Sequence, residues 1–78
     1  MPNIPALKGK KFLNYLLKYN CGLINDNGSH KTIVNLSNQK HSVVSFHGGK
    51  EISPIMFKII LKQLDINIDD FIKFINKN

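Results

Sequence analysis

The spacing of apolar residues along the chain changes from a helical to an alternating pattern and back again. From Lys8 the apolar positions recur every three or four residues, which predicts an amphipathic helix that Cys21-Gly22 ends. Its expected apolar side contains Phe12, Leu13, Leu16, Leu17 and Asn20, and its polar side contains Lys10, Lys11, Asn14 and Lys18. Two prolines within residues 1–6 favour an extended segment before this helix.

The middle of the chain predicts three β-strands, over residues 23–26, 30–36 and 41–47. The first is short and is expected at an edge, and Ser37-Asn38-Gln39-Lys40 is a polar turn between the other two. A hairpin centred between Asn38 and Gln39 would place His30 opposite His47 on one face of the sheet. That face is expected to be open to solvent and contains His30, Thr32, Val34, Val43, Ser45 and His47. The face expected to cover the core contains Lys31, Ile33, Asn35, Ser42, Val44 and Phe46.

Two further helices are predicted after the strands. Ser53 is a suitable N-cap for the first, and Pro54 suits its first turn. This helix is apolar around most of its circumference apart from Lys58 and Lys62, so we expect it to be enclosed between the sheet and another helix. The second starts at the cap Asn67 and carries apolar residues at helical spacing, namely Ile68, Phe71, Ile72 and Ile75.

This order predicts a single α+β domain over residues 1–78. It has the α-β-β-β-α arrangement of a three-stranded antiparallel sheet with helices packed on one face, and a short extra C-terminal helix. Double-stranded-RNA-binding domains use this arrangement, so we expect a dsRBD-like fold. Those domains begin their second helix with a lysine-rich phosphate clamp, whereas this chain has Ser53-Pro54-Ile55-Met56.

Positive charge narrows the range of partners. The 78 residues include 11 cationic and 5 acidic side chains, for a net charge of +6, and every cation is a lysine. A basic domain of this size favours a polyanionic partner such as RNA, which lysines contact through its phosphates. An A·T-rich genome would also enrich lysine, asparagine and isoleucine, so the charge has a purely compositional explanation as well.

Cysteine content and hydropathy suggest a compartment. Cys21 is the only cysteine and has no partner for a disulfide within the chain, so we interpret it as a small core residue in a reducing cytosol. No apolar stretch approaches the ~20 residues that span a bilayer, and no signal-peptide pattern is present. We expect a soluble, cytoplasmic protein that makes no membrane contact and is a monomer when free.

The segment Gly28-Ser29-His30-Lys31 offers the clearest chemistry. Gly28 and Ser29 suit a tight turn, which would present His30 on the first residue of a strand. Histidine gives and takes protons near neutral pH. RNA carries its own nucleophile, the 2′-hydroxyl, so cleavage needs a base, an acid and positive charge near the phosphate. His30 suits one of the first two roles, and His47 is a possible second acid or base. The candidate RNA-binding cations are Lys10, Lys11, Lys31 and Lys50.

Four fragments in order make the chain resemble the HicA family, the small mRNA-interferase toxins of toxin–antitoxin pairs. They are Ile4-Pro5-Ala6-Leu7-Lys8-Gly9-Lys10, then Gly22-Leu23 with Gly28-Ser29-His30, then Val44-Ser45-Phe46-His47-Gly48-Gly49-Lys50-Glu51-Ile52, and Ile60-Leu61-Lys62-Gln63. The resemblance implies a dsRBD-like fold, metal-independent endoribonuclease activity on mRNA with His30 as the catalytic residue, and neutralisation by a HicB-type antitoxin that covers His30. It implies no cofactor.

Two departures from the family pattern and three alternative interpretations accompany this resemblance. Asp26-Asn27 stands where the family often has basic residues, which should weaken local phosphate binding, and Ile55-Met56 replaces a Gly-Thr pair. One alternative is a non-catalytic RNA-binding module of the same fold, and another is a protein–protein adaptor. A zinc site is the third; its ligands would be Cys21, His30, His41 and His47, whose spacing matches no common ligand pattern.

Overall fold

The computed structural model describes residues 4–27, 30–45 and 50–77. Its elements follow in the order α1 (Gly9–Lys18), β1 (Cys21–Asn27), β2 (His30–Asn35), β3 (His41–Ser45), α2 (Pro54–Gln63) and α3 (Ile68–Lys77). The strands form one antiparallel sheet in the order β1-β2-β3. The predicted α+β, dsRBD-like arrangement with an extra C-terminal helix is therefore confirmed.

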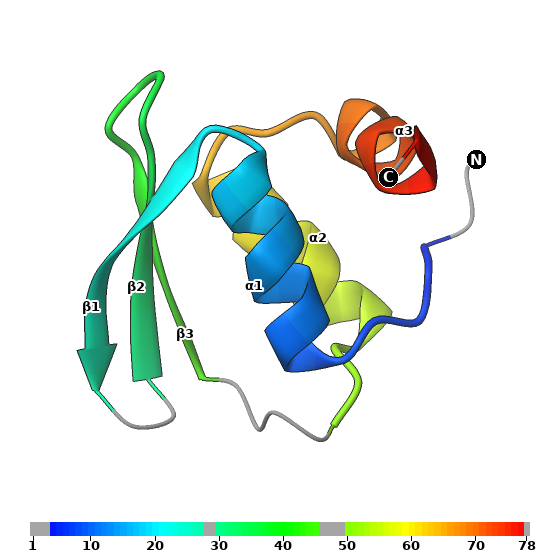
Figure 1. The fold of residues 1–78 in the computed structure, drawn as a ribbon, viewed down its shortest axis with the longest axis horizontal. Coiled ribbons are helices and arrows are strands. Elements are labelled where there is room, and N and C mark those ends of the chain that lie inside the picture. The colour runs from blue at the N-terminus through cyan, green and yellow to red at the C-terminus, as the bar shows by residue number, and fades with distance from the viewer. Residues whose placement is uncertain (1–3, 28–29, 46–49, 78) are drawn as a thin grey trace.

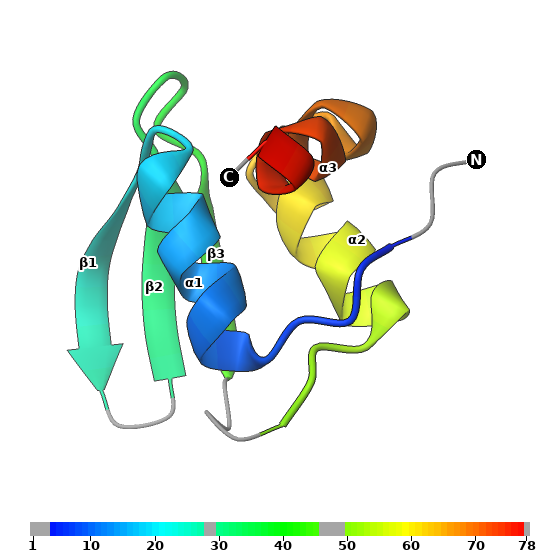
Figure 2. The ribbon, with the colours of Figure 1, turned by 45° about the vertical axis from the view of Figure 1, so that its right-hand side comes forward.

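The molecule has a sheet layer and a helical layer. All three helices lie on the same side of the sheet, and α3 lies farther from the sheet than the other two (Figure 1, Figure 2). Helix α1 packs against β1, and α2 packs against β3. No helix of residues 4–27, 30–45 and 50–77 covers the opposite face of the sheet, which we call the open face (Figure 1, Figure 2).

The aromatic centre of the core joins all three helices. The rings of Phe12 and Phe57 lie 5.2 Å apart between centroids, and Phe71 lies 5.9 Å from Phe12 and 5.8 Å from Phe57. Tyr19 meets Phe71 edge-on, and the pKa of its hydroxyl is raised by burial and then by the Asp70 carboxylate, so it stays neutral. The extra helix α3 is therefore an integral part of the core.

The predicted starts of the second and third helices are confirmed. The Ser53 hydroxyl accepts a hydrogen bond from the Met56 backbone N–H at 3.2 Å, and Pro54 is the first residue of α2. The Asn67 side chain accepts one from the Asp70 N–H at 3.0 Å. These side chains satisfy backbone donors that a helix start leaves without an internal partner.

The predicted end of the first helix is wrong. Helix α1 ends at Lys18, and Asn20 then adopts the left-handed conformation with φ of 58°. Asparagine tolerates this conformation better than most residues, so it can end a helix as glycine does. Cys21 consequently starts β1, where it is buried as expected, and neither Leu17 nor Asn20 belongs to the buried side of the helix.

The predicted register of the β2–β3 hairpin is also wrong, by two residues. His30 pairs with Ser45, Lys31 with Val44 and Ile33 with Ser42. The last hydrogen bond of the hairpin runs from the Asn35 N–H to the Lys40 carbonyl at 2.8 Å, so the loop starts at Leu36 and not at Ser37. Gln39 takes a positive φ of 64° within this loop.

A shift of two residues preserves the face that each side chain occupies. Ile33, Asn35, Ser42 and Val44 are buried as expected, while His30, Val43 and Ser45 on the other face are exposed. Val34 is the exception, since it is buried on the open face near the loop end of the middle strand, where it pairs with Gly22 and His41. Phe46 and His47 lie outside the described residues.

Helix α2 is only partly enclosed, contrary to prediction. Phe57, Ile60 and Leu61 are buried against the sheet and the other helices. Ile55, Met56 and Ile59 are exposed, as are Lys58 and Lys62. Because α1, α3 and the sheet cover only part of its circumference, one side of α2 meets no other helix or strand among the residues that the structure describes (Figure 2).

Candidate active site

His30 is the first residue of the middle strand and is exposed to solvent. It pairs with Asn27 of β1 on one side and with Ser45 of β3 on the other. Because β2 is paired on both edges, its backbone is held in place. The Cα and Cβ atoms of His30 are therefore fixed, and its side chain projects from the open face of the sheet. This is the arrangement that the sequence predicted for a presented histidine, except for its partner on β3.

Three predicted site residues, Gly28, Ser29 and His47, lie outside the described residues. The predicted pairing of His30 with His47 is wrong, because Ser45 is the cross-strand partner of His30 on β3. A role for His47 as a second acid or base stays a prediction without that geometric support.

A β-bulge determines which β1 residue faces His30. Leu23 pairs with Ile33, but Asn25 pairs with Thr32, so Ile24 is an extra residue in β1. Without it, the register would continue and place the Asp26 carboxylate opposite His30. With it, Asn27 occupies that position, which is the kind of side-chain redirection for which bulges are used near sites.

Asp26 pairs instead with Lys31. The Lys31 ammonium donates to the Asp26 carboxylate at 2.6 Å, and the two residues are direct cross-strand partners. Because adjacent residues of a strand point to opposite faces, this ion pair lies on the helix side and His30 on the open side. The structure therefore does not bring Lys31 together with His30. The Lys31 ammonium instead neutralises Asp26, the acid that was expected to weaken phosphate binding.

Lys50 reaches the same end of the molecule as His30. Its backbone carbonyl accepts a hydrogen bond from the Gly9 N–H at 3.0 Å, which attaches the segment before α2 to the start of α1. Lys50 is exposed and lines a hollow of about 210 Å³. Ser45, which is the cross-strand partner of His30, lines the same hollow. The other residues around this hollow are Glu51, Ile52, Ser53, Met56 and Ile60.

The lysines of α1 extend this cationic end. Lys10 and Lys11 are exposed in the first turn of the helix, and Lys8 directly precedes it. The starts of α1 and β2 and the end of β3 lie at one end of the molecule (Figure 1). We call Lys8, Lys10, Lys11 and Lys50 the basic end; none of them belongs to either ion pair recorded among the described residues.

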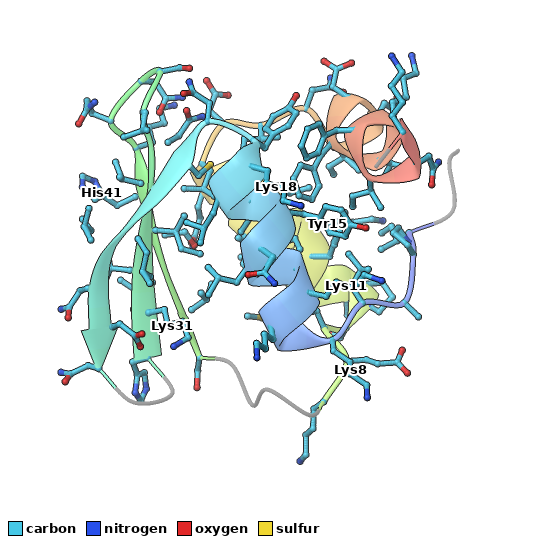
Figure 3. All side chains as sticks on the ribbon, viewed as in Figure 1. Lys8, Lys11, Tyr15, Lys18, Lys31 and His41 are labelled. Atoms are coloured by element: carbon cyan, nitrogen blue, oxygen red, sulfur yellow. The ribbon has the colours of Figure 1, made fainter. Side chains whose placement is uncertain are left out.

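Two α1 residues outside the predicted set of RNA-binding cations lie beside Lys11. Lys18 and Tyr15 line a small hollow of about 160 Å³ together with Lys11 and Asn14. Figure 3 shows Lys8, Lys11 and Lys18 following one another along the same side of α1. The spacing of three, seven and ten residues from Lys8 is the signal that could have found this row, since such positions share one side of a helix.

The structure separates two histidines of the conceivable zinc site. His41 pairs with Val34 at the start of β3, whereas His30 lies at the other end of the same ladder, roughly 13 Å away along the strands. Within residues 4–27, 30–45 and 50–77, no three potential ligands from His, Cys, Asp and Glu converge on one point. The part of the chain that the structure describes also has no helix with the length and apolar character needed to cross a bilayer.

A family comparison supplies the biological context of this site. Residues 9–66 match the model of the family described as the HicA toxin of bacterial toxin–antitoxin systems. The chain belongs to the HicA toxin family. It is therefore a toxin of a toxin–antitoxin system, and an antitoxin partner is implied. Searches of curated proteins and of solved structures find no match.

The HicA match covers most of the site and leaves part of the fold outside. It includes His30, the bulge in β1 and Lys50, but ends before α3. Helix α3 nevertheless contributes Phe71 to the centre of the core. The family model thus describes the region that carries the candidate chemistry, and the structure adds the helix that completes its support.

Proposed function

We propose that this toxin is a metal-independent endoribonuclease that cleaves mRNA, with His30 as its catalytic acid or base. The observation that carries the proposal is the position of His30. It is exposed, its strand is paired on both sides, and it lies at the end of the sheet nearest to the lysines of the basic end. The family assignment supports a toxic activity, and cleavage of mRNA in the cytoplasm would supply one.

The proposed reaction uses the RNA's own nucleophile. The 2′-hydroxyl attacks the adjacent phosphorus, a base takes its proton, and the bond from phosphorus to the 5′-oxygen breaks. The leaving oxygen takes a proton from an acid, giving a 2′,3′-cyclic phosphate and a 5′-hydroxyl. His30 fills one of these two roles, and Lys50, which lines a hollow with the cross-strand partner of His30, stabilises the charge that develops on the phosphate, while the α1 lysines bind other phosphates of the same RNA.

The proposed partner is a HicB-type antitoxin that covers the open face around His30. A toxin with a net charge of +6 should attract an acidic partner over distance, so association should slow as salt concentration rises. Blocking the approach of RNA to His30 would be enough to silence the activity without changing the toxin's fold.

The first experiment incubates the purified toxin with an unstructured RNA in the presence of EDTA. The proposal predicts cleavage, with products that carry 2′,3′-cyclic phosphate and 5′-hydroxyl ends. RNA that is bound in a salt-dependent manner but stays intact would contradict the enzyme and support the RNA-binding module instead. Neither binding nor cleavage would leave the adaptor interpretation.

A further inference from the structure

Helix α2 presents three neighbouring aliphatic side chains to solvent. Ile55, Met56 and Ile59 are 71, 38 and 43% exposed, whereas the other large apolar residues of α2 are buried. Single exposed apolar side chains are ordinary on a protein surface, but a contiguous group marks an interaction site. We call these three residues the α2 strip.

A row of cations borders the α2 strip. Ile55 and Ile59 are one turn apart, and Lys58 and Lys62 form a second row beside them at the same spacing. Both lysines are exposed and line a hollow of about 640 Å³ at the junction of α2 and α3. The acidic residues of that hollow, Asp65 and Asp69, come from the junction and from α3, so the α2 side is the cationic one.

We propose that the α2 strip is a docking surface for the antitoxin, which would present aliphatic side chains flanked by carboxylates. The aliphatic row would pack against Ile55 and Ile59, and the carboxylates would pair with Lys58 and Lys62. The identity of the partner rests on the proposed function, but the surface itself does not require His30 or RNA cleavage. It gives the antitoxin a contact beyond the open face of the sheet.

Charge and chemistry favour a protein partner over the alternatives. A two-fold, antiparallel packing of α2 against a second copy would place both lysine rows on the same side of the interface, where like charges repel. RNA is recognised through stacking on aromatic or arginine planes and through polar contacts, and the α2 strip is aliphatic. An acidic, aliphatic protein surface complements both rows at once.

The test measures the affinity of the toxin for a purified HicB-type antitoxin, using titration calorimetry and association kinetics. The Ile55→Ser/Ile59→Ser variant should bind at least about 30-fold more weakly, since both substitutions remove apolar surface that the antitoxin would bury. Leu17→Ser is the control, an exposed leucine on α1 that lies neither on α2 nor on the open face of the sheet, and should bind as wild type. Circular dichroism checks that each variant is folded.

The lysine row has its own variant and control. Lys58→Gln/Lys62→Gln should slow association severalfold at low salt and much less at high salt. Lys73→Gln/Lys77→Gln removes the same charge at the same spacing on α3 and should have the smaller effect. Equal effects of the two lysine pairs on the association rate would show that only net charge matters. That result would overturn the proposed role of Lys58 and Lys62 in docking.

Several outcomes would overturn the docking surface itself. Wild-type affinity of a folded Ile55→Ser/Ile59→Ser variant would do so directly. A wild-type dimer that this variant dissociates, measured by light scattering, would assign the strip to a second copy. Binding of wild type but not the variant to phosphatidylglycerol vesicles would assign it to a membrane. Failure of the toxin to cleave RNA would contradict the proposed function alone, because the affinity difference is measured without RNA.

Discussion

The two ends of the β2–β3 hairpin use polar residues in opposite ways. At the end that holds the loop, the buried Asn35 side chain donates to the Leu64 carbonyl at 2.7 Å, and the Ser42 hydroxyl lies 2.6 Å from the Gln63 side-chain oxygen. At the other end, His30, Ser45 and Lys50 are exposed. We call these the closed end and the open end.

The closed end stabilises the fold, whereas the open end presents the side chains that could act on a ligand. At the closed end, hydrogen bonds between the sheet and the end of α2 satisfy polar groups that would otherwise destabilise the core. At the open end, polar side chains stay accessible to a ligand. The same hairpin therefore anchors itself at one end and presents His30 at the other, so substitutions at the two ends should affect different properties.

The largest expected effect on stability comes from Asn35→Ala at the closed end. The substitution removes a buried hydrogen bond to the Leu64 carbonyl and the hydrogen bond that Asn35 accepts from the Ser37 N–H. The free energy of unfolding should therefore fall by about 1–3 kcal/mol. Urea denaturation measures this change. Activity per folded molecule should stay that of wild type; a large loss of activity at full stability would show that the closed end is not merely support.

Cys21, which pairs with Asn35, gives a second and smaller test of the closed end. Burial raises the pKa of its thiol, so less of the reactive thiolate is present in the folded protein at a given pH. Iodoacetamide should modify the native protein severalfold more slowly than the unfolded protein, because the buried thiol is both less ionised and less accessible to the reagent. Equal rates in buffer and in denaturant would show that this end opens readily.

The smallest expected effect tests how the bulge shapes the open end. The substitution Asn27→Asp would place a carboxylate opposite His30, where it would repel RNA phosphates and weaken RNA binding severalfold at low salt. Asp26→Asn removes a carboxylate from the helix side and serves as the control. Fluorescence anisotropy with a labelled RNA measures both. If Asp26→Asn raises RNA affinity by as much as Asn27→Asp lowers it, net charge alone explains both changes and the separation of Asp26 from His30 has no functional meaning.

Much of this contrast was predictable from the sequence, because local patterns determine it. The alternation of polar and apolar residues predicted which strand face is buried, and Ser53, Pro54 and Asn67 predicted the helix starts. The fragments around Gly28-Ser29-His30 predicted the family that residues 9–66 confirm. Each of these signals depends on a few neighbouring residues and needs no knowledge of distant contacts.

The parts that sequence reasoning missed depend on contacts between segments. A hairpin shifted by two residues keeps the same buried face, so the hydrophobic pattern could not distinguish Ser45 from His47 as the partner of His30. The bulge at Ile24, which decides whether Asp26 faces His30 or Lys31, left no signal that we identified in β1. The exposure of Ile55 and Ile59 depends on how the other described helices and strands pack around α2, which no local pattern reveals.

The most direct test of the central claim compares two histidines at the two ends of one ladder. His30 and His41 are both exposed strand residues, but only His30 lies at the open end (Figure 3 labels His41). Single-turnover cleavage of an unstructured RNA is measured for wild type, His30→Ala and His41→Ala, with urea denaturation confirming equal stability. Loss of a catalytic acid or base should slow His30→Ala by ~10²–10⁴-fold, while His41→Ala stays within a few-fold of wild type. A folded His30→Ala protein that cleaves as fast as His41→Ala would contradict the account.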